Sequence, residues 1–106
     1  MWSDVITIYR KYAGRVERIV AENCHMETKV EQEKTVMGEG EQQVCSFFIP
    51  GAAPVYPGDR VVAGIGPEVY DDSQLNGDTI PGLVELTFTK PCFCHGKLHH
   101  TETGNR

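Results

Sequence analysis

The sequence predicts an all-β fold, a small β-barrel or sandwich of about six short strands with long exposed loops. Three observations support this class. Short runs of β-branched and aromatic residues recur along the chain, Gly- and Pro-containing turn signals separate them, and no stretch favours a helix longer than two turns. The 106 residues suffice for one modest core, so we expect a single domain over residues 1–106.

The first half of the chain contains three predicted strands. Residues 5–9 (Val-Ile-Thr-Ile-Tyr) form the first. Residues 16–24 follow a turn at Ala13-Gly14 and are assigned to the second, although their apolar side chains also fall at helical spacing. Residues 26–40 are mostly charged and polar, which predicts an exposed hairpin or a mobile loop. The unbroken apolar run within residues 43–50 is typical of a strand covered on both sides.

The second half continues the pattern. A Pro-Gly-Asp turn at residues 57–59 leads into a predicted strand over residues 60–65. Residues 83–90 alternate between apolar and polar types, as a half-buried strand does. Pro91 is expected to end that strand, and His95-Gly96 to form the turn of a final hairpin.

Between these strands, residues 66–82 are rich in Gly, Pro and acidic side chains, and no Lys or Arg offsets the charge. A long acidic segment in so small a domain predicts a mobile loop that is either functional or disordered. Its four acidic residues are Glu68, Asp71, Asp72 and Asp78.

Composition excludes several classes of protein. The net charge of −5 disfavours tight binding of nucleic-acid phosphates, which calls for a basic surface. No apolar run approaches the ~20 residues that span a bilayer, so we expect no membrane association. The N-terminus does not resemble a signal peptide. In a reducing cytoplasm the four cysteines are expected to be free thiols or ligands.

One segment collects side chains that bind metals. The candidate zinc ligands are Cys92, Cys94, His95 and His99, with His100 as an alternative to His99. The single-residue gap between the cysteines differs from the two-residue gap of common zinc sites. In a strand both thiols would lie on one face, and two small buried thiols are the simpler interpretation. We therefore expect no metal or other cofactor.

No combination of residues predicts catalysis. Cys94 and His95 are neighbours in sequence, but neighbours in a strand face apart, and no third group is available to orient a base. Asp71 and Asp72 lack the spacing of a calcium loop, and Gly64-x-Gly66 lacks the third glycine of a dinucleotide loop. We expect the chain not to be an enzyme. Trp2 and Tyr56 are instead candidate contact residues, because aromatic side chains are enriched in interface cores. Each is equally well interpreted as a cover for the end of the barrel.

Four stretches of the chain together resemble a known family. They are residues 4–12 (DVITIYRKY), Phe48-Ile49-Pro50, residues 57–64 (PGDRVVAG) and residues 99–104 (HHTETG). In this order they are similar to the small minor capsid proteins of long-tailed bacteriophages that infect Gram-positive bacteria. These proteins act at the junction of head and tail.

The resemblance implies a structural role in the virion neck, after assembly in the cytoplasm of the bacterial host. Head-closure (stopper) proteins of this type are small β-barrels that form a homo-oligomeric ring. The ring would contact the portal or its adaptor on the head side, and a tail terminator or tail tube protein on the other. It would retain packaged DNA without binding it tightly. Asp71, Asp72 and Asp78 are then candidates for the lumen, and Tyr56 and Trp2 for the interfaces.

Two alternatives stay open at this point. The chain can equally be a tail terminator or tail-completion protein, since these are also small, acidic and driven by assembly. From a different class, a small interaction module stabilised by zinc at the Cys/His segment is the second alternative.

Overall fold

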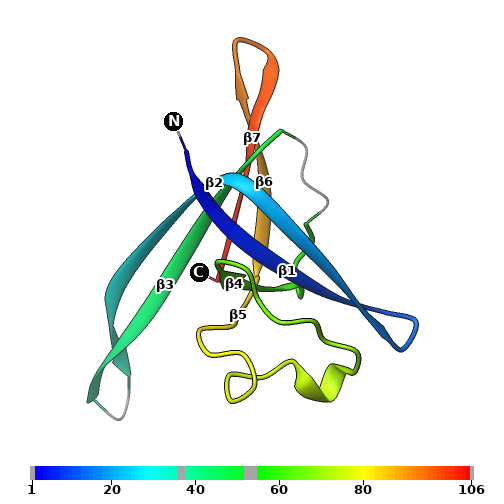
Figure 1. The fold of residues 1–106 in the computed structure, drawn as a ribbon. Helices are drawn as coiled ribbons and strands as arrows, with labels where there is room; N and C mark the ends of the chain where they lie inside the picture. The colour runs from blue at the N-terminus through cyan, green and yellow to red at the C-terminus, as the bar shows by residue number, and fades with distance from the viewer. Residues whose placement is uncertain (1, 36–37, 52–54, 106) are drawn as a thin grey trace.

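The computed structural model describes the backbone of residues 2–35, 38–51 and 55–105, and their side chains except within residues 29–43. The described strands form one antiparallel sheet in the order β5-β4-β1-β2-β3-β7-β6, curled into a half-barrel (Figure 1). The strands are β1 (Asp4–Tyr12), β2 (Arg15–Thr35), β3 (Gly38–Pro50), β4 (Arg60–Ala63), β5 (Val84–Glu85), β6 (Phe88–Cys94) and β7 (Lys97–Gly104). The predicted all-β class is confirmed, with seven strands in place of about six. In the described ranges no helix has the length and apolar character that crossing a membrane requires.

Strand β2 is the longest element and belongs to both halves of the sheet. Its residues 15–24 pair with β1, whereas residues 25–35 pair with β3. Where the two parts meet, the register against β1 shifts by one residue and Asn23 has a φ of 58°. An extra residue of this kind bends a strand, and Asn tolerates the left-handed conformation better than most residues. The bend allows the sheet to curl.

One face of the curled sheet holds the main core. Apolar side chains from β1 to β4 meet there with Val55 and Leu86. Within each strand the core residues are two positions apart, because every second side chain points to the same face of the sheet. Burial of a large apolar side chain stabilises the fold by about 1.5–3 kcal/mol. The buried members are Ile6, Ile8, Cys24, Cys45, Phe47, Ile49, Val55, Val61 and Leu86.

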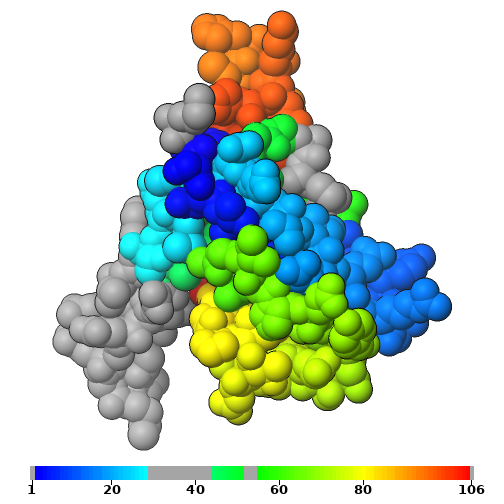
Figure 2. All heavy atoms as spheres, viewed as in Figure 1, coloured from blue at the N-terminus to red at the C-terminus, as the bar shows by residue number. Residues whose placement is uncertain are grey.

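The connection between β4 and β5 covers the opposite face of the sheet. Val69, Leu75 and Ile80 are buried there against Tyr9 of β1 and Val62 of β4. Figure 2 shows this connection, coloured yellow-green to yellow, lying over the lower part of the molecule. Its acidic residues are exposed, as expected of a surface segment. Its apolar residues form a second small core, which their irregular spacing in the sequence did not reveal.

Hydrogen bonds from the sheet fix the start of this connection. The Tyr9 hydroxyl donates to the Pro67 carbonyl over 2.6 Å. The backbone N–H of Gly66 donates to the Thr7 hydroxyl over 2.8 Å, and the Arg18 guanidinium donates to the Gly66 carbonyl over 2.7 Å. The connection is therefore tied to β1 and β2 by polar contacts as well as by apolar burial.

Two hairpins close with the tight turns expected from the sequence. At Ala13-Gly14 the φ values are 49° and 78°, and at His95-Gly96 they are 53° and 78°. Positive φ at both central residues defines the type I′ turn, whose twist matches that of the flanking strands. The first turn joins β1 to β2 and the second joins β6 to β7.

The strand predicted over residues 83–90 is divided between the two halves of the half-barrel. Its beginning, β5, pairs with β4, whereas β6 pairs with β7. The chain crosses at Leu86-Thr87, where Leu86 N–H bonds to the Asp59 carbonyl and Thr87 N–H to the Gly104 carbonyl. The expectation that Pro91 ends the strand is wrong. Pro91 lies within β6, which is an edge strand, and an edge position tolerates a residue without an N–H.

Residues 26–40, predicted as an exposed hairpin or a mobile loop, have the backbone of a hairpin. Strand β3 pairs with β7 only at residues 46–50, whereas its pairing with β2 continues outward to Thr35↔Gly38. The outer part of the β2–β3 hairpin therefore extends beyond the end of β7, as Figure 1 shows. We call this extension, residues 28–35 and 38–45, the arm. Residues 36 and 37 lie outside the described residues.

Candidate assembly surface

Trp2 lies on the outer face of the sheet within a cluster of aromatic rings. Its ring centroid is 5.3 Å from that of His100, 5.9 Å from Phe48, and 6.0 Å from both His25 and His99. His25 of β2 pairs directly with Phe48 of β3, so the sheet itself brings these rings together. Aromatic pairs at such separations contribute about 0.5–1.5 kcal/mol each beyond their buried area. Trp2, predicted as a contact residue, thus also covers part of the sheet.

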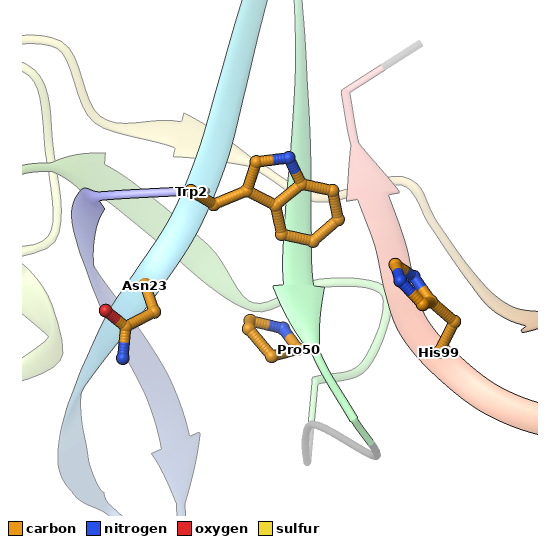
Figure 3. Close-up of a pocket in the computed structure, with 4 residues that line it drawn as sticks. All are labelled: Trp2, Asn23, Pro50 and His99. Carbon is orange, nitrogen blue, oxygen red and sulfur yellow. The ribbon is translucent and has the colours of Figure 1, made fainter.

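A hollow of about 420 Å³ opens beside the Trp2 indole. Asn23, Pro50 and His99 line it together with Trp2, and Figure 3 shows the indole lying above Pro50, with Asn23 and His99 on either side. Three of these four side chains present rings, and Asn23 supplies an amide. A hollow of this size accommodates an aromatic side chain of another protein.

Trp2 also lines a second hollow of about 270 Å³, which has one acidic residue in its wall. Glu27 lines it, and its Oε1 is 3.3 Å from His25 Nε2. The Asp4 carboxylate lies 3.9 Å from His25 Nδ1 and accepts a hydrogen bond from the Met26 N–H. Asp4 and Glu27 are half-exposed, so the surface around the Trp2 rings carries negative charge.

A bulge in β7 directs His99 toward this surface. Cys92 pairs with His100 but the next residue, Phe93, pairs with Leu98, which leaves His99 as the extra residue. Bulges often redirect a side chain in this way. The Nδ1 atoms of His99 and His100 are consequently only 2.8 Å apart, whereas neighbours in a regular strand face apart.

The structure separates the residues proposed as zinc ligands. Cys94 and His95 are exposed at the tip of the β6–β7 hairpin, whereas His99 joins the Trp2 cluster. Throughout the described ranges, no three His, Cys, Asp or Glu side chains converge as a metal site would require. The interpretation of Cys92 and Cys94 as buried thiols is wrong: Cys92 is half-buried and Cys94 exposed, because the edge strand β6 leaves the core toward its tip.

Tyr56 has both a structural contact and an exposed ring. The Arg10 guanidinium lies 4.6 Å from the ring centroid, and the ring is 58% exposed. The same guanidinium contacts both carboxylate oxygens of Asp59, at 2.8–3.2 Å. Hydrogen bonding to Asp59 raises the pKa of Arg10. Tyr56 therefore packs against a partly buried ion pair while more than half of its own surface stays exposed.

The three aspartates predicted for a DNA-facing lumen are exposed on the β4–β5 connection. Asp71 caps the short 3-10 helix η1 (Asp72–Gln74), and the N–H of Ser73, followed by the Asp72 side chain, lowers the pKa of Asp71. Asp72 lies 3.6 Å from the Lys11 ammonium on β1. Asp78 is exposed beyond η1. All three carboxyls face solvent, whereas the direction they take in an assembly stays a prediction.

No family model, curated protein or solved structure matches this chain. Its function must therefore be inferred from the surface just described. The sequence points to Trp2 but not to its ring partners, since only the pairing of β2, β3 and β7 brings them together.

Two further exposed rings lie next to hairpin turns. Tyr12, directly before the turn of the β1–β2 hairpin, is 66% exposed, and so is Phe93 near the turn of the β6–β7 hairpin. An aromatic residue adjoining a predicted turn was the available sequence signal for both. Large exposed apolar side chains at projecting positions are typical of surfaces that contact other proteins.

Proposed function

We propose that this chain is a structural protein of a bacteriophage neck, where copies form a ring at the head–tail interface. The ring closes the head, retains packaged DNA and docks the tail. The observation that carries the proposal is the shape of the subunit: three β-hairpins leave one small half-barrel in different directions (Figure 1). Hairpins of this kind carry backbone edges and side chains away from their own core, where a neighbouring subunit can cover them.

The arm supports an assembled state in particular. It is a two-stranded ribbon, and two-stranded ribbons are marginally stable in water without a third strand or a packed face. At its base the arm is held by Asn105, whose N–H donates to the Cys45 carbonyl and whose side chain accepts from the Cys45 N–H. From Val44 outward, the strand pairing described for the arm is that between β2 and β3 alone. Contact with a neighbouring subunit or with the portal would provide such a third strand or packed face.

The negative charge of the subunit suits a position beside DNA that must pass through the ring without adhering to it. The net charge is −5, and Asp71, Asp72 and Asp78 are exposed together on one connection. Like charge repels the phosphate backbone, so a ring that presents this connection to its lumen would not hold DNA by adhesion. This orientation is part of the proposal.

The test uses DNA-filled phage heads that lack the protein. Purified protein is added, the vertices are imaged by negative-stain electron microscopy, and DNA retention is measured as protection from nuclease. A new ring at the portal vertex together with increased protection is the expected result. Heads that gain neither a ring nor protection would contradict the proposal.

The same experiment separates the alternatives. Binding to isolated tail tubes but not to heads would assign the chain to tail terminators. Binding to neither, with stoichiometric zinc in the freshly purified protein, would favour the zinc-stabilised module.

A further inference from the structure

The Trp2 hollow has a chemistry that selects its occupant. Its walls are the indole, a proline ring and an imidazole, with the Asn23 amide at one side (Figure 3). The adjoining surface carries the carboxylates of Asp4 and Glu27. A fitting partner therefore presents one aromatic side chain flanked by positive charge.

The turn of the β1–β2 hairpin presents those groups. Tyr12 is 66% exposed, and Lys11 and Arg15 flank it, both exposed. Lys11 approaches Asp72 at 3.6 Å, a surface pair that leaves its side chain half-exposed. Because the turn at Ala13-Gly14 is tight, it presents Tyr12 at the end of a narrow projection.

The hollow and the hairpin turn cannot meet within one molecule. They lie at opposite ends of β1, which at about 3.3 Å per residue separates them by about 30 Å. Figures 1 and 2 show the β1–β2 hairpin directed away from the N-terminus. Any contact between them joins two copies and uses a different surface on each.

We propose that Tyr12 of one copy occupies the Trp2 hollow of the next, with Arg15 and Lys11 facing Asp4 and Glu27. Such a contact is heterologous, because it uses a different surface on each copy, and it can repeat from copy to copy. The copies close into a ring when a whole number of them completes a full rotation. This contact rests on the proposed ring function, for which it supplies the subunit interface. It is tested separately, in solution, without phage heads.

The experiment combines two variants that lack opposite halves of the contact. Tyr12→Ala retains the hollow, and Trp2→Ala retains the hairpin turn. The Tyr12→Ala protein is labelled with ¹⁵N and titrated with unlabelled Trp2→Ala protein up to about 1 mM, and the indole N–H signal of Trp2 is followed by NMR. We expect a saturable shift of that signal. Labelled Tyr12→Ala titrated with unlabelled Tyr12→Ala should show an at least tenfold weaker effect, since a buried aromatic anchor commonly has an effect of this size.

A charge exchange provides a second measurement, in case Trp2→Ala perturbs the fold. Arg15→Glu in the unlabelled partner, which here carries the wild-type Trp2, should weaken the contact about two- to fivefold. Glu27→Arg in the labelled partner should restore it. Tyr70→Ala, which removes another exposed ring, serves as the matched control and should leave the titration unchanged.

The outcomes distinguish this contact from the neck function. No shift of the Trp2 signal at 1 mM, or an equal shift with either unlabelled variant, would overturn the contact. If wild-type protein still forms rings on heads in that case, the neck function stands. If the contact saturates but heads acquire no ring, the contact stands and the neck function falls.

Discussion

At the scale of single residues, the ion pair between Arg10 and Asp59 holds the turn before β4 against β1. The Asp59 side chain is only 6% exposed, and it also accepts a hydrogen bond from the Tyr56 N–H. The Arg10 side chain is 19% exposed, so removing the carboxylate should cost less than breaking a fully buried pair, about 2 kcal/mol. We expect Asp59→Ala to lower the free energy of unfolding by that amount in urea titrations. Asp78→Ala, at an exposed site, should change it by less than about 0.5 kcal/mol; equal effects would contradict this account.

Two buried groups make the protein sensitive to alkaline pH. Burial raises the pKa of the Tyr9 phenol, and burial followed by the Asp4 charge raises the pKa of the Cys24 thiol. The folded state therefore favours the protonated form of each group more than the unfolded state does. The stability that results is fully present below the unfolded pKa values and is lost as pH rises through the folded ones. We expect the free energy of unfolding to fall between about pH 8 and pH 11.

The substitution Tyr9→Phe removes only the phenol hydroxyl and so tests its contribution to stability. At neutral pH it should cost about 1 kcal/mol through the lost hydrogen bond to the Pro67 carbonyl. Above pH 10 its stability should decline less steeply than that of the wild type. Parallel curves for the two proteins at alkaline pH would show that Tyr9 does not contribute to the decline.

At the scale of elements, the β4–β5 connection depends on a close approach at Gly66. A methyl group added there would overlap the Tyr9 hydroxyl and crowd the Val62 side chain. Overpacking of this kind typically costs 1–3 kcal/mol, so we expect Gly66→Ala to lower the free energy of unfolding by about 2 kcal/mol. Gly77→Ala is the matched control, because a methyl group there meets no atom within 4 Å. Thermal denaturation of the two variants tests this prediction. Similar melting temperatures for both would show that the close approach at Gly66 does not constrain the connection.

The arm should matter for assembly and little for the core. Replacing residues 31–42 with Asn-Gly shortens the β2–β3 hairpin and retains a favourable two-residue turn. The described members of the main core all lie outside the removed segment. We expect an unfolding midpoint close to that of the wild type together with loss of ring formation on heads. A shortened protein that still forms rings would exclude the arm from the assembly contacts.

The predictability of these elements follows from burial. The strands at residues 5–9 and 43–50 were predictable because buried apolar side chains mark them, and two turns were predictable from their glycines. The full length of β2 was not, since the sequence of the arm is polar and shows no apolar periodicity. Trp2 was predicted as a contact residue because it is aromatic and near the terminus, and its contact with another protein stays a prediction. Its partners His25, Phe48 and His100 were not, because strands distant in sequence bring them together.

At the scale of the whole molecule, both edges of the sheet resist extension. Strand β5 at one edge has two residues, and β6 at the other contains Pro91, which has no N–H to donate to an added strand. Copies that paired edge to edge would form open sheets, whereas the proposed ring has a fixed number of copies. Because neither edge strand favours pairing with another copy, we expect copies to meet through the hairpins and the Trp2 surface. This expectation is consistent with the proposed heterologous contact.

Three exposed aspartates determine how much negative charge the proposed ring would present to DNA. Asp71→Asn, Asp72→Asn and Asp78→Asn together change the net charge from −5 to −2. The fold should persist, because all three side chains are exposed and Asn replaces Asp well as the cap of η1.

If these carboxylates face the lumen, the triple variant will still close heads, but DNA will leave more slowly when release is triggered, since repulsion between the wall and the phosphates is reduced. Release is followed by fluorescence of a DNA-binding dye at low and high salt, and the difference from wild type should diminish as salt screens the charges. Identical release at low salt would place the aspartates on the outside of the ring.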